Sequence, residues 1–249
     1  MLTTALSGGI IGLIFGFILQ RTRFCMTGGF RDMYIARNNT LFYAFLIAIT
    51  VESIGVLSLI KLGIIGNPYE EFSVLGAIVG SYLFGIGIVL AGGCATGTWY
   101  RAGEGLLGSG VALFFYMTSA AAMKSGFLVP LNQLIAKRWV INDDLAGQLG
   151  IPVWYFLVFL VAITSFVVIR ELRKPRRQIA SLPSKYKGVR HYLFEKTYHK
   201  YFAGLLIGLV AFIAWPASQL TGRVGGLGIT TPSAHLISYC LLYTSPSPR

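Results

Sequence analysis

Residues 92–105 read GGCATGTWYRAGEG, and this glycine-rich stretch separates two apolar runs, residues 72–91 and 106–123. An apolar run of about 20 residues can cross the hydrocarbon core of a bilayer as a helix. A helix satisfies its own backbone hydrogen bonds there, which other open structures cannot do. The stretch therefore marks a helix–break–helix arrangement in a membrane protein. It places a thiol, a cation and a carboxylate at the break.

The composition of the whole chain supports a membrane protein. Of its 249 residues, 55% are hydrophobic and 12% are charged, about half the roughly 25% charge of a soluble domain. The first apolar run lacks a basic leader and a small-residue cleavage site, so we expect a span and not a cleaved signal peptide. The fold class that follows is an all-α integral membrane protein with several spans. Spans are predicted at residues 5–20, 40–63, 72–91, 106–123, 152–169 and 202–218.

Two further segments predict short re-entrant or broken helices. Residues 126–136 are apolar but too short to span, and Pro130 interrupts them; residues 222–235 are rich in glycine and lie beside a span. Irregular backbone at membrane depth is tolerated where protein or a water-filled cavity covers it. Broken helices of this kind often mark a transport site.

The net charge of +12 lies mostly in one loop. Residues 170–200 carry ten lysines and arginines against two glutamates. An excess of positive charge beside spans is typical of a cytoplasmic loop that contacts anionic lipid headgroups. This distribution favours a topology signal over nucleic-acid binding. With the loop 170–201 inside, alternation of the spans places residues 21–39 and 92–105 inside and the N-terminus outside.

The three cysteines do not predict a disulfide framework or a metal centre. Cys25, Cys94 and Cys240 form no C-x-x-C pair, and the chain has only three histidines. Zinc sites use three or four such ligands at characteristic spacings. We therefore expect no metal site and no cofactor.

The residues around Cys94 are suited to an anion. Gly92 and Gly93 can end a helix, because glycine adopts positive φ readily. Gly97 keeps the next turn bare, so its amides can approach a ligand, and a helix N-terminus adds partial positive charge. Arg101 adds a full positive charge, and Glu104 is expected to pair with Arg101. A glycine-rich packing corner with an inert, buried cysteine remains an alternative.

A second stretch, FCMTGGFRD around Cys25, repeats the pattern of a cysteine, glycines and a charged pair, here Arg31 and Asp32. The repetition favours a function for both cysteines. A thiolate would repel an anion, so a neutral S–H donor is the more useful form. Glu52, near the middle of the 40–63 span, is expected either to pair with an arginine or to belong to a proton or substrate path.

The two cysteine stretches resemble the paired cysteine motifs of the YeeE/YedE family of sulfur-compound transporters. The stretch GLGITTPSAH, which ends at His235, is similar to the segment that opens the second half of that family. The resemblance implies a helical, channel-like transporter with short, inward-dipping helices. It would comprise one full half and part of a second pseudo-repeat, in a bacterial inner membrane. The implied activity is uptake of thiosulfate or a related small sulfur-containing ion, without enzymatic turnover.

In the mechanism proposed for that family, cysteines pass the ion along by transient S–H···S contacts. Residues 1–239 would form the transporter domain, which lacks the family's later cysteine–glycine motif. Residues 240–249 resemble translated adaptor sequence, so we interpret them as a non-native tail. A soluble sulfur carrier of the TusA type is the implied partner. The residues expected along the substrate path are Cys25, Arg31, Asp32, Gly93, Cys94, Gly97, Arg101 and Glu104.

Two other functions are compatible with the residues alone. A membrane thiol-dependent sulfurtransferase or redox component could work with a soluble sulfur carrier, although no C-x-x-C or cofactor motif supports it. A structural membrane subunit could instead dock a catalytic partner through its basic loop.

Overall fold

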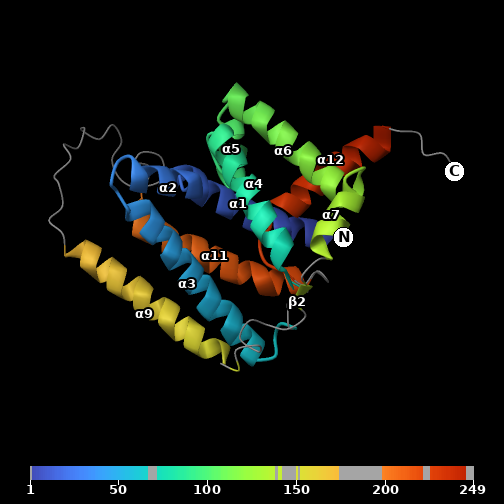
Figure 1. Ribbon diagram of the computed structural model, residues 1–249. Coiled ribbons are helices and arrows are strands. Elements are labelled where there is room, and N and C mark those ends of the chain that lie inside the picture. The colour runs from blue at the N-terminus through green and yellow to red at the C-terminus, as the bar shows by residue number, and fades with distance from the viewer. Residues whose placement is uncertain are drawn as a thin grey trace.

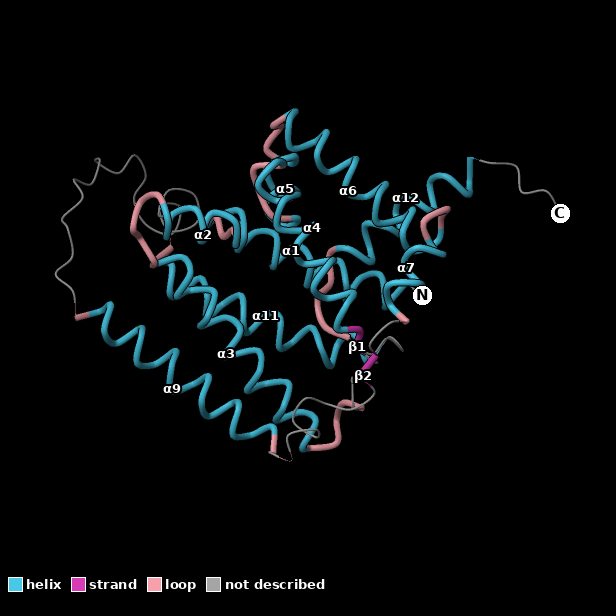
Figure 2. The backbone as a smooth tube through the Cα atoms, in the orientation of Figure 1, coloured by secondary structure: helices cyan, strands magenta, loops and turns pink. Residues whose placement is uncertain are grey.

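The structure is a computed structural model that describes residues 2–66, 72–137, 140–141, 150, 152–173, 198–220 and 225–244. These residues are almost entirely helical (Figure 2), which confirms the predicted fold class. Two strands of two residues each, β1 (Phe72–Ser73) and β2 (Val140–Ile141), pair antiparallel.

Six long helices coincide with the six predicted spans. They are α1 (Leu2–Thr22), α3 (Thr40–Lys61), α4 (Val74–Leu90), α6 (Leu107–Ser125), α9 (Val153–Leu172) and α11 (Lys200–Leu220). Four shorter helices complete the described part: α2 (Met26–Tyr34), α5 (Ala95–Gly103), α7 (Val129–Ala136) and α12 (Thr230–Thr244). Among the described residues, five helical elements are long and apolar enough to cross a membrane, and up to six if a bent pair counts as one span.

Helices α3, α9 and α11 lie side by side on one side of the molecule (Figure 1). The contact between α3 and α11 is very close, because a Cβ on Gly204 or Gly208 would collide with the backbone of Ala44 or Ala48. These pairs show that the two helices run in the same direction. The hydroxyls of Thr50 and Thr164 lie 2.9 Å apart and join α3 to an antiparallel α9. Both directions agree with the predicted alternation of spans.

Helices α5, α6, α7 and α12 lie on the other side of the molecule (Figure 1). The axis bends by 70° between α6 and α7, so a broken helix is present as predicted. The break lies at residues 126–128, however, and Pro130 does not interrupt the second segment, because it lies in the first turn of α7, where a proline is tolerated. Helix α12 packs along α6 through polar pairs: Tyr116 with Thr230 at 2.6 Å and Lys124 with His235 at 3.2 Å. Residues 225–229 are not helical, so the described part of 222–235 also agrees with a break before a short helix.

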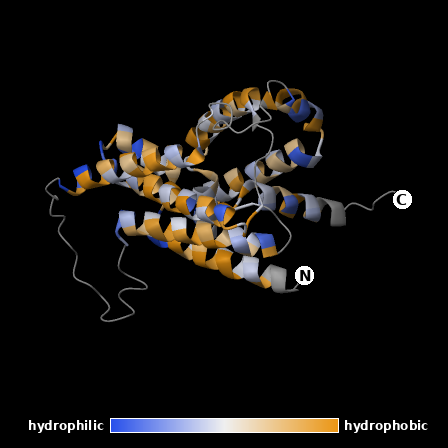
Figure 3. Ribbon diagram, turned by 90° about the horizontal axis from the view of Figure 1, so that it is seen from below, coloured by the Kyte–Doolittle hydropathy of each residue, from blue (hydrophilic) through white to orange (hydrophobic). Residues whose placement is uncertain are grey.

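The outward faces of the long helices are largely hydrophobic (Figure 3). Helix α4 contains no buried residue at all, and Leu83, Phe84 and Leu90 are well exposed on it. In water such a surface would be unfavourable, but lipid tails are as apolar as leucine. The exposed apolar surface is therefore the expected surface of a protein in a bilayer.

Several predicted features lie outside the described residues. One of them is most of the basic loop 170–201. The end of the suggested tail, residues 245–249, also lies outside them, whereas α12 continues through residue 244. The predicted orientation in the membrane and the domain limits thus stay predictions.

Candidate functional site

Both cysteines of interest lie at breaks in membrane-length helical elements. Leu6–Tyr34 and Val74–Gly103 each meet the length and hydropathy of a span. The first is interrupted between α1 and α2 just before Cys25, and the second between α4 and α5 just before Cys94. Each cysteine is the N-cap residue of the short helix that follows it.

The two breaks have the same backbone geometry. Arg23 and Gly92 adopt positive φ, +47° and +66°. In each break the amide of the next residue bonds to the carbonyl five positions earlier: Phe24 to Leu19 at 3.2 Å, and Gly93 to Ile88 at 3.1 Å. This is the Schellman motif, which closes a helix and turns the chain. The repeat seen in the sequence is therefore also a structural repeat.

The tertiary fold brings the two thiols into contact. Cys25 Sγ and Cys94 Sγ lie 3.4 Å apart, and either thiol can donate to the other. The amide of Gly97 also donates to Cys94 Sγ at 3.3 Å. Cys25 is only 3% exposed, whereas Cys94 is half-buried. Two thiols that are 69 positions apart in sequence thus form one site at the meeting point of the two breaks.

Gly97 makes this contact possible. A Cβ at this position would lie 3.0 Å from Cys25 Sγ and 3.6 Å from Cys94 Sγ. Gly93, within the break, leaves space for Arg101 in the same way: a Cβ on Gly93 would lie 3.2 Å from Arg101 Nη1. Both predicted site glycines therefore keep space free for a site side chain.

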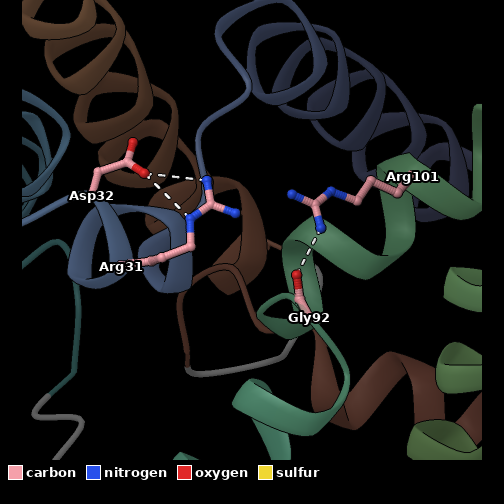
Figure 4. Close-up of polar contacts among 4 residues, drawn as sticks. All are labelled: Arg31, Asp32, Gly92 and Arg101. Carbon is pink, nitrogen blue, oxygen red and sulfur yellow. Dashed lines mark hydrogen bonds and ion pairs between the residues drawn. The ribbon is translucent and has the colours of Figure 1, made fainter. Parts of the chain in front are cut away.

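The expected pairing of Arg101 with Glu104 is wrong. Arg101 Nη1 donates to the carbonyl oxygen of Gly92 at 2.8 Å (Figure 4). Glu104 Oε1 instead accepts from Gln20 Nε2 of α1 at 3.1 Å. The reason is the Schellman turn, which leaves the Gly92 carbonyl open to a cation, while Glu104 at the end of α5 faces α1. Arg101 thus braces the break itself.

The predicted pair of Arg31 and Asp32 is confirmed. Arg31 Nη2 lies 3.2 Å from Asp32 Oδ1, and the pair is well exposed. Figure 4 shows the guanidinium groups of Arg31 on α2 and Arg101 on α5 pointing toward one another. The two short helices that start at the thiols therefore each carry a cation toward the space between them.

Glu52 has an aromatic partner and no arginine partner among the described residues. Its Oε1 accepts a hydrogen bond from the indole Nε1 of Trp215 on α11, at 3.4 Å. Several arginines, such as Arg223, lie outside the described residues. Both alternatives for Glu52, an arginine partner and a place in a proton or substrate path, therefore stay predictions.

The sequence reasoning missed one polar group beside the site. Thr27 Oγ1, in the first turn of α2, is buried and has no hydrogen-bond partner among the described residues. Buried polar groups are nearly always satisfied, so an exception calls for an explanation. The signal was present: both stretches read Cys-x-Thr-Gly, with Thr27 and Thr96 at the same position. Thr96, with Trp99 and Tyr100, lines a mostly apolar cavity of about 540 Å³ between α1, α5 and α12.

The thiol contact makes a direct prediction. A disulfide needs an S–S distance of about 2.05 Å, so the 3.4 Å pair requires only a small shift. Diamide should oxidise Cys25 and Cys94 to a disulfide, with loss of two hydrogen atoms to the diamide. The disulfide should be detected by loss of labelling with a polyethylene glycol maleimide and reversed by dithiothreitol. In the Cys240→Ser variant, diamide should still cause the loss of labelling. In the double variant Cys240→Ser/Cys25→Ser, labelling of Cys94 should not be lost. Full labelling of Cys94 in the Cys240→Ser variant after diamide treatment would contradict the contact between Cys25 and Cys94.

Comparison with known proteins agrees with this architecture. The family model described as "Sulphur transport" matches residues 21–247, which includes both breaks. The chain belongs to the sulphur transport family. It is 50% identical to thiosulfate transporter TsuA of Escherichia coli (strain K12) over 239 residues, which cover 96% of this chain and 68% of that protein. It is 32% identical to the TsuA of Spirochaeta thermophila, over 90% of this chain and 66% of that one.

The membership confirms the resemblance to the YeeE/YedE family. A shorter match of 96 residues, 42% identical, is to the probable transporter YedE of Escherichia coli, over 39% of this chain and 23% of that protein. The relatives carry the names of transporters, which supports the expectation that the chain is not an enzyme. The chain spans about two thirds of the length of the two TsuA proteins.

Proposed function

We propose that this chain takes part in the uptake of thiosulfate, or a related small sulfur-containing ion, across a bacterial inner membrane. The proposed path passes between Cys25 and Cys94. The observation that carries the proposal is the contact of the two thiols, 3.4 Å apart, where two broken spans meet. The thiosulfate transporters among the relatives support the choice of ion.

The chemistry of the breaks matches the two ends of thiosulfate. Its terminal sulfur is a soft acceptor for an S–H group, and its oxygens are hard acceptors. Helices α2 and α5 both begin at the thiols, so their first amides and helix dipoles favour oxyanions there. Arg31 and Arg101 add positive charge beside them (Figure 4). The unsatisfied hydroxyl of Thr27 offers a further donor.

The thiol contact also suits conduction. In the structure one thiol donates to the other, so an arriving sulfur atom can take over this S–H donor and exchange one S–H···S contact for another. Exchanges of hydrogen bonds have small net free energies, about 1 kcal/mol. A site that conducts must bind its ion well enough to admit it and weakly enough to release it. A neutral thiol pair meets this requirement better than a fixed charge.

The proposal includes an orientation and a partner. The N-terminus would lie outside, and the basic loop 170–201 would lie in the cytoplasm, where a TusA-type carrier could receive the sulfur. The positive-inside rule supports the orientation. A carrier that docks on the loop by charge would bind less tightly as the salt concentration rises.

Uptake of ³⁵S-labelled thiosulfate by membrane vesicles tests this function. The complete reading frame that carries this sequence should be expressed in a host without its own uptake system. We expect saturable uptake that excess unlabelled thiosulfate abolishes. Excess sulfate should change uptake by no more than about twofold relative to uptake without a competitor, because sulfate lacks the soft sulfur. Mass spectrometry of Cys25 and Cys94 during uptake should find both thiols unmodified. Absence of thiosulfate uptake would refute the transport proposal, and a covalent sulfur adduct required for turnover would refute its non-enzymatic nature.

A further inference from the structure

A carboxyl group lies within the membrane-spanning part of the chain and has no role in the thiol site. Among the described residues, Glu52 is the only acidic side chain in the interior of a long helix. It sits near the middle of α3, on the side that faces α11. An ionisable side chain at this depth is costly and is usually functional.

Among the residues that the structure describes, no charged group pairs with Glu52. The indole of Trp215 donates its single described hydrogen bond, and no described cation pairs with it. On α3 itself, Tyr43 and Lys61 are each nine residues away, about 14 Å along the helix axis. The elements packed most extensively against α3 are α2, α9 and α11. Their described titratable groups all lie near helix ends: Arg31, Asp32, Tyr34, Tyr155, Arg170, Glu171, Lys200 and Tyr201.

This environment suits a carboxyl group that exchanges a proton. An indole N–H can donate to the carbonyl oxygen of the neutral acid or to the carboxylate. Without a cation nearby, nothing holds the charged form permanently, and the second oxygen has no described partner. A permanent structural charge would need a compensating partner in this setting.

The proposed function creates a need for such a proton. Thiosulfate is a dianion, and each elementary charge that crosses a membrane potential carries a fixed free-energy cost. A potential that is negative inside lowers the equilibrium concentration of an anion inside by a certain factor. For a dianion this factor is the square of the factor for a monoanion. One proton that moves with each ion reduces the opposition to the monoanion value.

A chain of contacts leads from Glu52 to α5, the helix that begins next to Cys94. The ring of Trp215 lies so close to Gly226 that a Cβ there would be 2.7 Å from Nε1. The non-helical residues 225–229 lead into α12, where Ser233 Oγ donates to the carbonyl of Ile229 at 2.6 Å. Ser233 in turn accepts from Trp99 Nε1 of α5 at 3.2 Å. Two indoles thus hold the 225–229 break between the carboxyl group and the helix that begins at Cys94.

We propose that Glu52 binds a proton that is transported together with the sulfur-containing ion. The inference rests on the proposed function. The proton comes from the water on the side of uptake, neutralises the Glu52 carboxylate, and leaves to the other side as the ion is released. The hydrogen bond from Trp215 to Glu52 changes in strength when the carboxyl group gains or loses its proton, and Trp215 contacts the 225–229 break at Gly226.

Reconstituted vesicles separate proton coupling from ion passage. With the outside more acidic, vesicles that contain the wild-type protein should accumulate ³⁵S-thiosulfate. Their lumen should become more acidic, as a pH-sensitive dye inside reports. In Glu52→Gln, accumulation should fall at least about tenfold and acidification should stop, because each charge adds a large free-energy cost. Exchange of internal for external thiosulfate needs no net proton movement, so it should remain within about twofold of wild type.

Matched variants exclude other roles of the carboxyl group. Glu52→Asp keeps a titratable group and should retain coupling, and Glu171→Gln, at the end of α9, should behave as wild type. Arg223 lies outside the described residues, so the double variant Glu52→Gln/Arg223→Gln tests for a fixed ion pair. Restored accumulation in that double variant, or normal accumulation in Glu52→Gln alone, would overturn the inference while thiosulfate exchange still supports the proposed function. Absence of any exchange in the wild type would instead refute the proposed function.

Discussion

Replacement of Cys94 by alanine is expected to abolish uptake of thiosulfate. The substitution removes the thiol that contacts Cys25 at 3.4 Å and the sulfur that accepts from the Gly97 amide at 3.3 Å. Both the soft contact for the ion and the N-cap of α5 are lost. Uptake should fall below about 1% of wild type, the size of effect caused by about 3 kcal/mol in the barrier. Uptake of ³⁵S-thiosulfate and growth on thiosulfate as the sole sulfur source both measure it.

A serine at position 94 separates the two losses. Serine is a good N-cap residue, so Cys94→Ser keeps the cap and a hydrogen-bond donor but not the soft sulfur. We expect it to insert normally and still fail to take up thiosulfate. Cys240→Ala is the matched control, because Cys240 is exposed on α12, and it should grow normally. Normal growth of Cys94→Ala on thiosulfate, with uptake of the host removed, would contradict the proposed path.

Substitution of Gly97 by alanine is expected to impair uptake through a single methyl group. The new Cβ would lie 3.0 Å from Cys25 Sγ, closer than ordinary van der Waals contact, so the Cys25 thiol must shift by a few tenths of an ångström. Insertion of one carbon into a packed site typically costs about 1–3 kcal/mol. Uptake should therefore fall about tenfold or more, and the yield of the diamide disulfide should fall with it.

Gly103→Ala provides the control on the same helix. A Cβ at Gly103 meets no atom within 4 Å, so this variant should transport and cross-link as wild type. The comparison removes any general effect of alanine on α5. Equal uptake by the two variants would show that the space at Gly97 is not part of the path.

Much of the fold could be predicted because it depends on local properties. The length of each apolar run determines whether it can span, and all six predicted spans are helices. The breaks before Cys25 and Cys94 were also predictable, since glycines and charged residues interrupt the apolar runs there. The pair of Arg31 and Asp32 was within reach because the two residues are neighbours.

The partners of single side chains were not predictable in the same way. Arg101 and Glu104 are three positions apart and of opposite charge, which favoured a pair. The open carbonyl of Gly92 and the position of Gln20 on α1 depend on how the chain turns and packs. For Glu52 the sequence left open an arginine partner or a place in a proton or substrate path, and neither alternative predicted the indole that α11 supplies. Charge complementarity alone does not identify partners when backbone groups and distant helices compete for the same side chains.

The sequence by itself determined that this chain is a helical membrane protein with two similar cysteine stretches at helix breaks. That information is carried by hydropathy, run length and turn-forming residues, which act within a few positions along the chain. Only the tertiary structure decided that the two thiols touch, with Gly97 leaving room between them, and that the carboxyl group of Glu52 meets Trp215. These contacts join residues far apart in the chain, and they arise from the close packing of α3 against α11 and of α1 beside α5.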